Sequence, residues 1–172
     1  MPPQHVSWRQ LVDTGEVYNV EVEGLKGSPL FMLSEYKKKK IVLSNEVFIL
    51  SPFDILNVFR HRLRNFFDFD YQVECFVPKP KRKYGYFALP ILIGDTFVAR
   101  MDSKAERKER VLVVHNLYFE KVNVDKSMLV KIIGAIEDFA TFNECDSVEI
   151  KKSNNKVFLK TIRAGLIDAD SS

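Results

Sequence analysis

The sequence has few of the residues that bind metals or form disulfides. Its 172 residues include only two cysteines and three histidines, and Cys75 and Cys145 form no CxxC or Cys/His cluster. A structural zinc site needs four such ligands at short spacings, so we expect neither a metal nor another cofactor. Two reduced, buried thiols are the preferred interpretation of the cysteines, with a single disulfide as the alternative.

Long apolar runs and familiar catalytic motifs are also missing. No hydrophobic stretch reaches the roughly 20 residues that span a bilayer, and the opening MPPQHVSWRQLV lacks the charged and apolar regions of a signal peptide. We therefore expect a soluble protein of the cytoplasm with no membrane partner. The lack of GxSxG, HExxH, P-loop and GxGxxG patterns argues against the enzyme classes that use those motifs.

What the sequence does contain is enough apolar surface for a core and a mild excess of positive charge. Hydrophobic residues make up 46% of the chain and charged residues 28%, as in a globular protein. The net charge of +3 permits binding to nucleic acid without requiring it. Basic residues lie among aromatic residues between positions 51 and 110, and this mixture points to a polyanionic partner.

The first fifty residues predict a small mixed segment. Ser7 can cap a short helix over 8–13 that stops at Gly15. Alternating polar and apolar residues then predict a strand over 16–24. The lysine run 37–40 is interpreted as a solvated loop.

A helix that carries arginines is predicted next. The motif SPFD at 51–54 is a helix-entry signal, and a helix over 53–67 gives an apolar face with residues three and four apart. Arg60 and Arg64 lie four apart, so they project together from a neighbouring face, whereas Arg62 lies elsewhere around the helix. The apolar face consists of Leu56, Phe59, Leu63 and Phe67.

Several strands follow and predict a twisted antiparallel sheet. An alternating strand over 68–78 leads into a basic loop that its prolines keep extended. In the apolar stretch after this loop, Gly85 indicates a bulge or a close backbone approach, and Pro90 indicates an edge or a bulge. Residues 103–110 predict a loop or a short helical turn, which Asp102 would cap, before another strand.

The last third of the chain predicts one long helix and a hairpin. The helix spans 124–143 and begins at Asp125 or Ser127. Two short strands, 148–151 and 157–162, are predicted around an Asn-Asn turn. The fold class is therefore α+β, with an antiparallel twisted sheet or a partly open barrel and a few packed helices.

A set of motifs lies in order along the central stretch: SPFD at 51–54, Arg60, Arg62, FDFDY at 67–71, Glu74, Pro78, KRKYGYFALPILIGD at 81–95, AR at 99–100, the D-x-K-A of 102–105, Arg107 and the strand VLVVHNLY. With these motifs the stretch resembles the C-terminal region of the AlkZ/YcaQ-like family of bacterial winged-helix DNA glycosylases, which excise alkylated bases and unhook interstrand cross-links. It departs from the family pattern at Ile55, where relatives generally have Asn or a similar residue, and at Phe59, where they generally have an acidic residue.

The resemblance implies a division of the chain and a missing part. Residues 1–50 would be a small α/β segment that completes a winged-helix-like unit, and residues 51–172 would be the α+β C-terminal domain. The family's catalytic Gln-x-Gln or Gln-x-Asp motif lies upstream of the region matched here and is absent from this chain. We therefore expect a C-terminal fragment without glycosylase activity, whose partner is the N-terminal winged-helix part of the parent protein.

Duplex DNA, bound without sequence preference, is the expected partner of the basic residues. Lysine and arginine side chains neutralise phosphates and supply most of the salt-dependent affinity for DNA. Two alternatives stay open: a structural brace that touches DNA little, and a protein-interaction module. The candidate DNA-binding residues are Arg60, Arg62, Arg64, Lys81, Arg82, Lys83, Tyr84, Arg100, Lys104 and Arg107.

Overall fold

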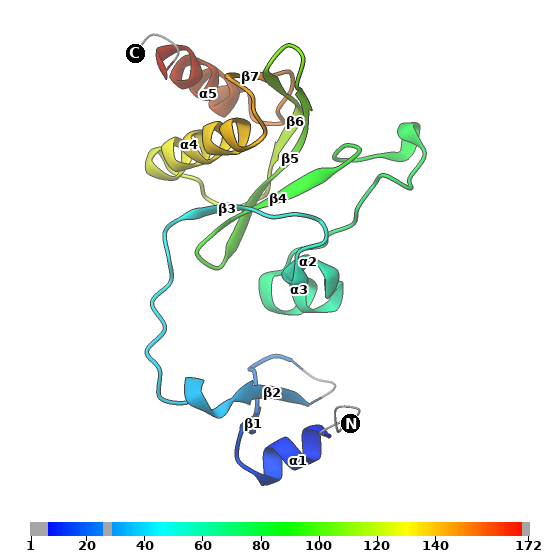
Figure 1. The fold of residues 1–172 in the computed structure, drawn as a ribbon, viewed down its shortest axis with the longest axis vertical. Coiled ribbons are helices and arrows are strands. Elements are labelled where there is room, and N and C mark those ends of the chain that lie inside the picture. Colours follow the sequence, from blue (N-terminus) through cyan, green and yellow to red (C-terminus); the bar gives the residue numbers. More distant parts are fainter. Residues whose placement is uncertain (1–6, 26–28, 170–172) are drawn as a thin grey trace. The chain divides into compact units, whose positions relative to one another are not determined.

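The computed structural model describes residues 7–25 and 29–169 (Figure 1). The chain divides into two compact units between Val42 and Leu43. The sequence interpretation placed this boundary after residue 50, but the strand β3 (Val47–Ile49) pairs with β4 (Ala88–Ile93) and so belongs to the second unit.

The first unit is a short helix followed by a two-stranded hairpin. Ser7 caps α1 (Trp8–Asp13) and forms a reciprocal capping box with Gln10, as the sequence predicted for the cap. The antiparallel strands are β1 (Val17–Val20) and β2 (Leu30–Leu33), and the 3₁₀ turn η1 (Ser34–Tyr36) follows them. That this unit completes a winged-helix-like element stays a prediction.

The second unit is built on a curled five-stranded sheet. The strand order is β3-β4-β5-β6-β7, antiparallel from β3 to β6, with β7 parallel to β6 (Figure 1). The predicted α+β class with a twisted, partly open sheet is confirmed. The remaining strands of this sheet are β5 (Thr96–Glu106), β6 (Val111–Phe119) and β7 (Ser147–Ile150).

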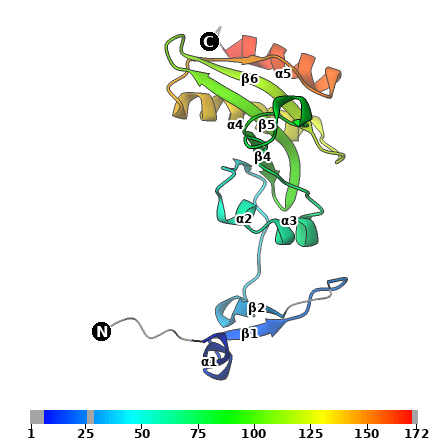
Figure 2. The ribbon, with the colours of Figure 1, turned by 90° about the vertical axis from the view of Figure 1, so that its right-hand side faces the viewer.

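Two helices cover one face of this sheet and form the main core with it (Figure 2). The long helix α4 (Lys126–Phe142) confirms the predicted helix over 124–143. Its side chains Leu129, Ile132 and Ile136 are buried, as their spacing of three and four residues requires. Of the two candidate caps, Asp125 is the one used, since its carboxylate accepts the N–H of Met128 at 2.8 Å.

The predicted helix over 53–67 is interrupted. The structure has α2 (Ile55–Val58) and α3 (Arg60–Phe67), separated by Phe59, whose ψ of 68° is not helical. The ring of Phe59 is 41% exposed and does not join the buried face to which the sequence assigned it. Leu63 is buried in a smaller second core together with Phe69, Tyr71 and Phe97.

Two predicted strands are wrong. Residues 68–78 alternate in polarity, but they pair with no strand and run as irregular chain. Residues 157–162 lie in α5 (Lys156–Ala169), because Asn155 caps a helix there by accepting the N–H groups of Val157 and Phe158. In that helix Phe158 and Ile162 meet the main core four residues apart, a spacing that a strand does not give.

The segment predicted as a loop or helical turn is also different. β5 continues through Glu106, and the turn follows only at 107–110. Asp102 therefore lies inside a strand and caps no helix. The predictions made from Pro90 and Gly85 are confirmed. A β-bulge lies near Pro90, between Ile91 and Leu92. The backbone at Gly85 lies close to the side chain of Asp102, as described below.

Candidate nucleic-acid interface

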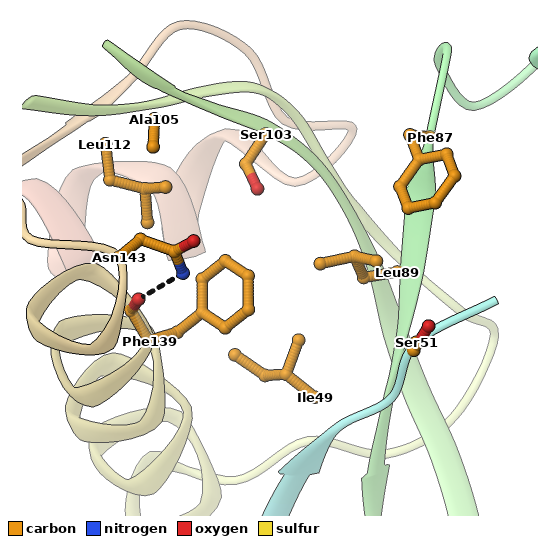
Figure 3. A pocket seen from close by; sticks show the side chains of 9 residues that line it. All are labelled: Ile49, Ser51, Phe87, Leu89, Ser103, Ala105, Leu112, Phe139 and Asn143. Carbon is orange, nitrogen blue, oxygen red and sulfur yellow. Dashed lines mark hydrogen bonds between the residues drawn. The ribbon is translucent and has the colours of Figure 1, made fainter. Parts of the chain in front are cut away.

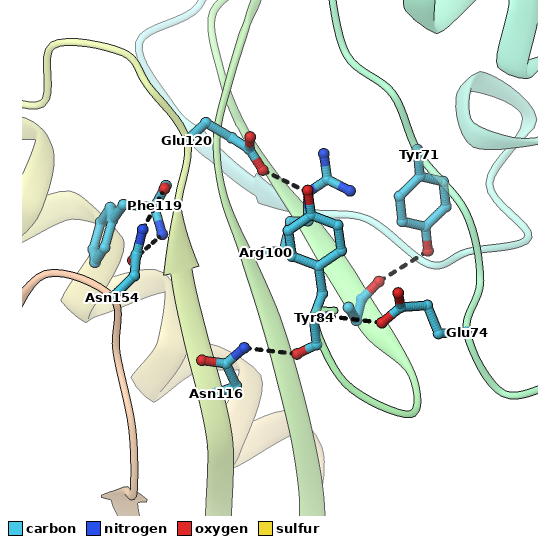
Figure 4. A network of polar contacts seen from close by, with 9 residues as sticks. Tyr71, Glu74, Tyr84, Arg100, Asn116, Phe119, Glu120 and Asn154 are labelled. Atoms are coloured by element: carbon cyan, nitrogen blue, oxygen red, sulfur yellow. Dashed lines mark hydrogen bonds and ion pairs between the residues drawn. The ribbon is translucent and has the colours of Figure 1, made fainter. Parts of the chain in front are cut away.

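The sheet face opposite α4 carries a row of polar and aromatic side chains. Arg100 lies opposite Tyr118, and Asp102 lies opposite Asn116, in the β5–β6 pair. Their neighbours Ala99, Met101, Leu117 and Phe119 point into the main core. Because successive strand residues alternate between faces, the polar set shares the other face, and the chain between 69 and 87 crosses it (Figure 4).

Glu74 anchors the segment of residues 79–87, which we call the basic segment. Its carboxylate accepts three successive backbone N–H groups, from Lys83 at 2.8 Å, Tyr84 at 2.7 Å and Gly85 at 3.0 Å. Burial alone would raise the pKa of Glu74. The three N–H groups and the nearby charge of Arg100 outweigh burial and hold the pKa of this carboxyl below its usual value.

The sheet holds the basic segment at two further points. Asp102 accepts the N–H of Phe87 at 2.9 Å. The Asn116 amide donates to the carbonyl of Tyr84 at 2.7 Å (Figure 4). A Cβ on Gly85 would lie 2.2 Å from the Asp102 side chain, so only glycine allows this approach. Both buried carboxylates of this face therefore bind backbone, which fixes the segment against β5 and β6.

Arg100 lies beneath the surface and does not project from it. Its side chain is 3% exposed, its Nε donates to Glu120 at 2.5 Å, and its Nη1 has no hydrogen-bond partner among the described residues. The guanidinium carbon lies 4.2 Å from the centre of the Phe69 ring and 4.0 Å from that of Tyr84. Arg100 is thus clamped between two aromatic faces and is not available to an outside phosphate in this arrangement.

The basic segment presents three consecutive cations. It begins with the 3₁₀ turn η2 (Lys79–Lys81), in which Lys81 is exposed. Arg82 donates to the carbonyl of Val77 at 2.8 Å and lies over the ring of Tyr86. Lys83 is exposed and lies over the ring of Tyr84, whose phenol raises the pKa of this lysine and keeps it charged.

The other candidate residues lie on two separate elements. Arg60, Arg62 and Arg64 are exposed on α3, where Arg64 pairs with Asp70 at 2.7 Å. At the far end of β5, Lys104 pairs with Glu106, and Arg107 is exposed in the turn that follows. Among the described residues, no hydrogen bond or ion pair joins either group to the basic segment. Of the ten predicted DNA-binding residues, the structure therefore groups only Lys81, Arg82, Lys83 and Tyr84, with the buried Arg100 against the ring of Tyr84.

A pocket of about 320 Å³ lies beside the basic segment. Its walls include Phe69, Tyr84, Phe97 and Tyr118, and Glu120 contributes a carboxylate. The sequence interpretation missed Tyr118 and Glu120. The signal was present, because polar residues at 116, 118 and 120 alternate with buried Leu117 and Phe119.

A second pocket, of similar volume, lies between the sheet and the C-terminal end of α4 (Figure 3). Ile49, Leu89 and Phe139 form its apolar walls, and the Ser103 hydroxyl faces into it. The Asn143 amide beside it donates to the carbonyl of Phe139 at 2.7 Å. None of its lining residues carries a charge, so it offers no acid or base for chemistry.

Over residues 7–25 and 29–169, no cluster of three His, Cys, Asp or Glu side chains is placed to hold a metal ion. Cys75 and Cys145 are both free thiols, so the disulfide alternative is wrong. Cys145 is buried as expected, whereas Cys75 is only half-buried. In the same part of the chain, no helix combines the length and apolarity needed to cross a membrane.

Most of the chain matches a known protein family. The model of the family described as DNA glycosylase AlkZ-like matches residues 6–142. The matched region contains the basic segment, the polar sheet face and α4, and it ends before β7. No solved structure matches the chain.

Proposed function

Because the chain belongs to the AlkZ-like DNA glycosylase family, we propose that it binds duplex DNA through the exposed side chains of the basic segment. The observation that supports this most is the fixed backbone of residues 83–85, which the Glu74 carboxylate holds by three hydrogen bonds. A cationic segment that is already ordered loses little conformational entropy when it meets a phosphate backbone.

The partner is duplex DNA, contacted at phosphates and without sequence preference. Lys81, Arg82 and Lys83 form the first contact group, and the arginines of α3 form a second. Arg100 is not in the contact surface, because Glu120 and two aromatic rings occupy its guanidinium. Its role is to support Tyr84 from below.

Binding, and not bond cleavage, is the role proposed for this chain. The Gln-x-Gln or Gln-x-Asp motif implied by the family resemblance does not occur in its sequence. The catalytic partner would be a winged-helix part of the parent repair protein that carries this motif. The chain would then act in the cytoplasm, on the nucleoid.

The test is fluorescence-anisotropy binding to a short labelled duplex over a salt series. The variant Lys81→Ala/Arg82→Ala/Lys83→Ala should lower the salt slope by up to about three units, roughly one for each lost phosphate contact. The matched control is Lys37→Ala/Lys38→Ala/Lys39→Ala, which removes the same charge from the first unit and should keep the slope.

Two results would contradict the proposal. One is the absence of binding by the unchanged protein at low salt. The other is an equal loss of affinity in both triple variants, because net charge alone would then explain the binding.

A brace or protein-interaction role is the second candidate, and one observation favours it. The apolar side chains Phe53, Ile55 and Val58, in and beside α2, are each more than half exposed. Exposed apolar groups that lie close together are a common mark of contact with another protein surface. Absence of DNA binding in the salt series would leave this candidate as the function.

A further inference from the structure

The β3 edge of the five-stranded sheet is unpaired in the part of the chain that the structure describes. β3 stands at the end of the strand order and pairs only with β4. The N–H of Leu50 donates to the carbonyl of Pro90 at 2.9 Å, on the β4 side. Because the direction of hydrogen bonding alternates along an antiparallel strand, the backbone groups of Val47 and Ile49 point to the free edge. A further strand can therefore pair there.

The opposite edge of the sheet, at β7, is protected. The Arg163 guanidinium of α5 donates to the carbonyls of Ile150 and Lys151. The ion pair of Glu149 with Lys151 adds charge at the same place. Charged groups at an edge discourage pairing with another chain, and the Val-Phe-Ile sequence of β3 has none.

A groove of about 710 Å³ lies beside the β3 edge, between β3 and α4. The stripe of α4 that lines it has small residues at its centre, and a Cβ at Gly134 would meet nothing within 4 Å. The exposed ring of Phe142, four residues beyond Asp138, extends this stripe. The groove therefore has room for the apolar side chains of an added strand. The α4 stripe consists of Lys131, Gly134, Ala135 and Asp138.

The chain contains a segment whose character fits this groove. Residues 39–46 run without a turn or a bend up to β3. Within them Ile41, Val42 and Leu43 are 67%, 81% and 56% exposed. Isoleucine and valine favour strands, yet Ile41 and Val42 lie in none of the strands of the described chain. An exposed apolar run of this kind, directly before an open sheet edge, is suited to pairing between two copies of a chain.

We propose that two copies of this chain form a dimer in which residues 41–49 of each copy pair as antiparallel strands about a two-fold axis at Asn45. Each copy then supplies a strand to the β3 edge of the other, so the contact closes on itself. The basic segment takes no part in this pairing, so the dimer is independent of the proposed DNA surface.

The register of this pairing agrees with the two faces of the sheet. Leu43 lies opposite Val47 of the second copy, and Ile41 lies opposite Ile49. Opposed residues share one face, and Val47 and Ile49 pack against the main core on the α4 face. The side chains of Ile41 and Leu43 therefore reach the α4 stripe of the second copy. In an extended chain, positions 41 and 43 also direct their backbone groups to the same edge as positions 47 and 49.

The charges agree with the direction of the pairing. Lys131, at the start of the stripe, donates to the carbonyl of Asn45 at 3.1 Å, and the C-terminal end of α4 lies beside Ile49 at the second pocket. α4 therefore runs in the same direction as β3. The strand of the second copy runs the other way, which brings its lysines 37–40 toward Asp138 and away from Lys131. Exposed ion pairs contribute less than about 1 kcal/mol, so strand pairing and apolar contact carry the association.

The test is sedimentation equilibrium of the full chain between about 5 and about 500 µM, because one strand pair makes a small interface and a weak dimer. The unchanged protein should show a concentration-dependent equilibrium between monomer and dimer. Leu43→Pro removes an N–H directed at the second copy and should weaken the dimer about tenfold or more, since symmetry removes two hydrogen bonds. The matched control Val42→Pro, whose N–H points the other way, should retain the dimer.

A second pair of variants tests the groove. Gly134→Leu adds a side chain where a Cβ has free space, and it raises helix propensity, so the variant should stay folded. It should abolish the dimer, because it occupies the place of Leu43 from the second copy. Thr161→Leu adds the same bulk to the exposed side of α5 and should retain the dimer. Circular dichroism and thermal unfolding check that each variant is folded.

The proposal fails in any of three cases. One is a monomer at every concentration of the unchanged protein. Another is equal behaviour of the two proline variants, which would show that the pairing does not follow this register. The third is a dimer that survives Gly134→Leu, which would place the contact on another surface.

Discussion

At the scale of single residues, the two buried carboxylates of the polar face act on the protein's own backbone. Glu74 and Asp102 are each 8% exposed, and both accept backbone N–H groups of the basic segment. Carboxylates that accept several N–H groups form strong, charge-assisted hydrogen bonds. The position of the cations in 81–83 therefore depends on two acidic side chains.

The first prediction concerns Glu74→Gln. A neutral amide offers one acceptor oxygen to three N–H groups, so we expect a loss of roughly 2 kcal/mol in the free energy of unfolding at pH 7. The pKa of Glu74 is lower in the folded than in the unfolded protein, so its contribution is complete above the unfolded pKa. As pH falls through the folded pKa this contribution disappears, and the difference between the two proteins should shrink. Urea unfolding between pH 7 and pH 3 measures it.

Glu149→Gln is the control for this prediction. Glu149 is an exposed carboxylate on β7 whose ion pair with Lys151 lies in solvent, so its change should alter stability by less than about 0.5 kcal/mol. A Glu74 variant as stable as the Glu149 variant at pH 7 would show that the three N–H groups find other partners.

A second prediction concerns Tyr71, whose hydroxyl donates to the carbonyl of Ala88 at 2.9 Å. Burial raises the pKa of Tyr71 to about 12. A raised folded pKa means that the stabilisation is complete below the unfolded pKa, about 10, and is lost as pH rises toward 12. Tyr71→Phe should cost about 1 kcal/mol at pH 8, with a smaller difference at pH 11.

Urea unfolding at the two pH values measures this difference. Tyr86→Phe, at a ring that is 56% exposed, is the control and should give no difference at either pH. A Tyr71→Phe difference that stays constant with pH would contradict the raised pKa.

At the scale of elements, the start of α4 gives a prediction that the sequence left open. Asp125→Ala should lower stability by about 1 kcal/mol, because the N–H of Met128 loses its acceptor. Ser127→Ala, at an exposed position inside the first turn, should change stability by less than about 0.5 kcal/mol. Thermal unfolding of both variants measures these changes in stability. Equal losses of stability in the two variants would mean that Asp125 and Ser127 share the capping role.

The elements that the sequence identified correctly are those whose residue pattern is compatible with only one type of secondary structure. A long apolar stripe with a capping residue defines α4, and Ser7 with Gln10 defines the start of α1. The alternation in 68–78 failed as a predictor because a strand also needs a partner, and sequence spacing does not supply one. The stretch 157–162 fits both the two-residue period of a strand and the 3.6-residue period of a helix. The cap at Asn155 and the core contacts of Phe158 and Ile162 favour the helix.

The candidate site was predictable in its charge and not in its geometry. The cations of 81–83 are evident from the sequence and do lie exposed or half-buried on one segment. Burial of Arg100 depends on Glu120, twenty residues further along the chain, and on rings from two other segments. Such long-range contacts depend on which residues of neighbouring strands lie opposite one another. The local sequence pattern does not predict that register here.

At the scale of the whole molecule, the two units differ in what holds them together. Among residues 7–25 and 29–42 none is buried, whereas the second unit contains both hydrophobic cores. We predict that residues 43–172 expressed alone unfold in one cooperative transition, and that residues 1–42 alone are unfolded. Circular dichroism on both pieces tests this. A folded 1–42 piece, or an unfolded 43–172 piece, would contradict it.

The carboxylate of Glu74 has a consequence for how the protein would move on a nucleic acid. Three consecutive amides pointing to one place are what many proteins use to lock a phosphate group, and here that place is already filled from within. An incoming phosphate therefore meets only the ends of long side chains, which exchange one phosphate for the next at little cost. In the proposed complex with DNA, such a hold favours diffusion along the duplex.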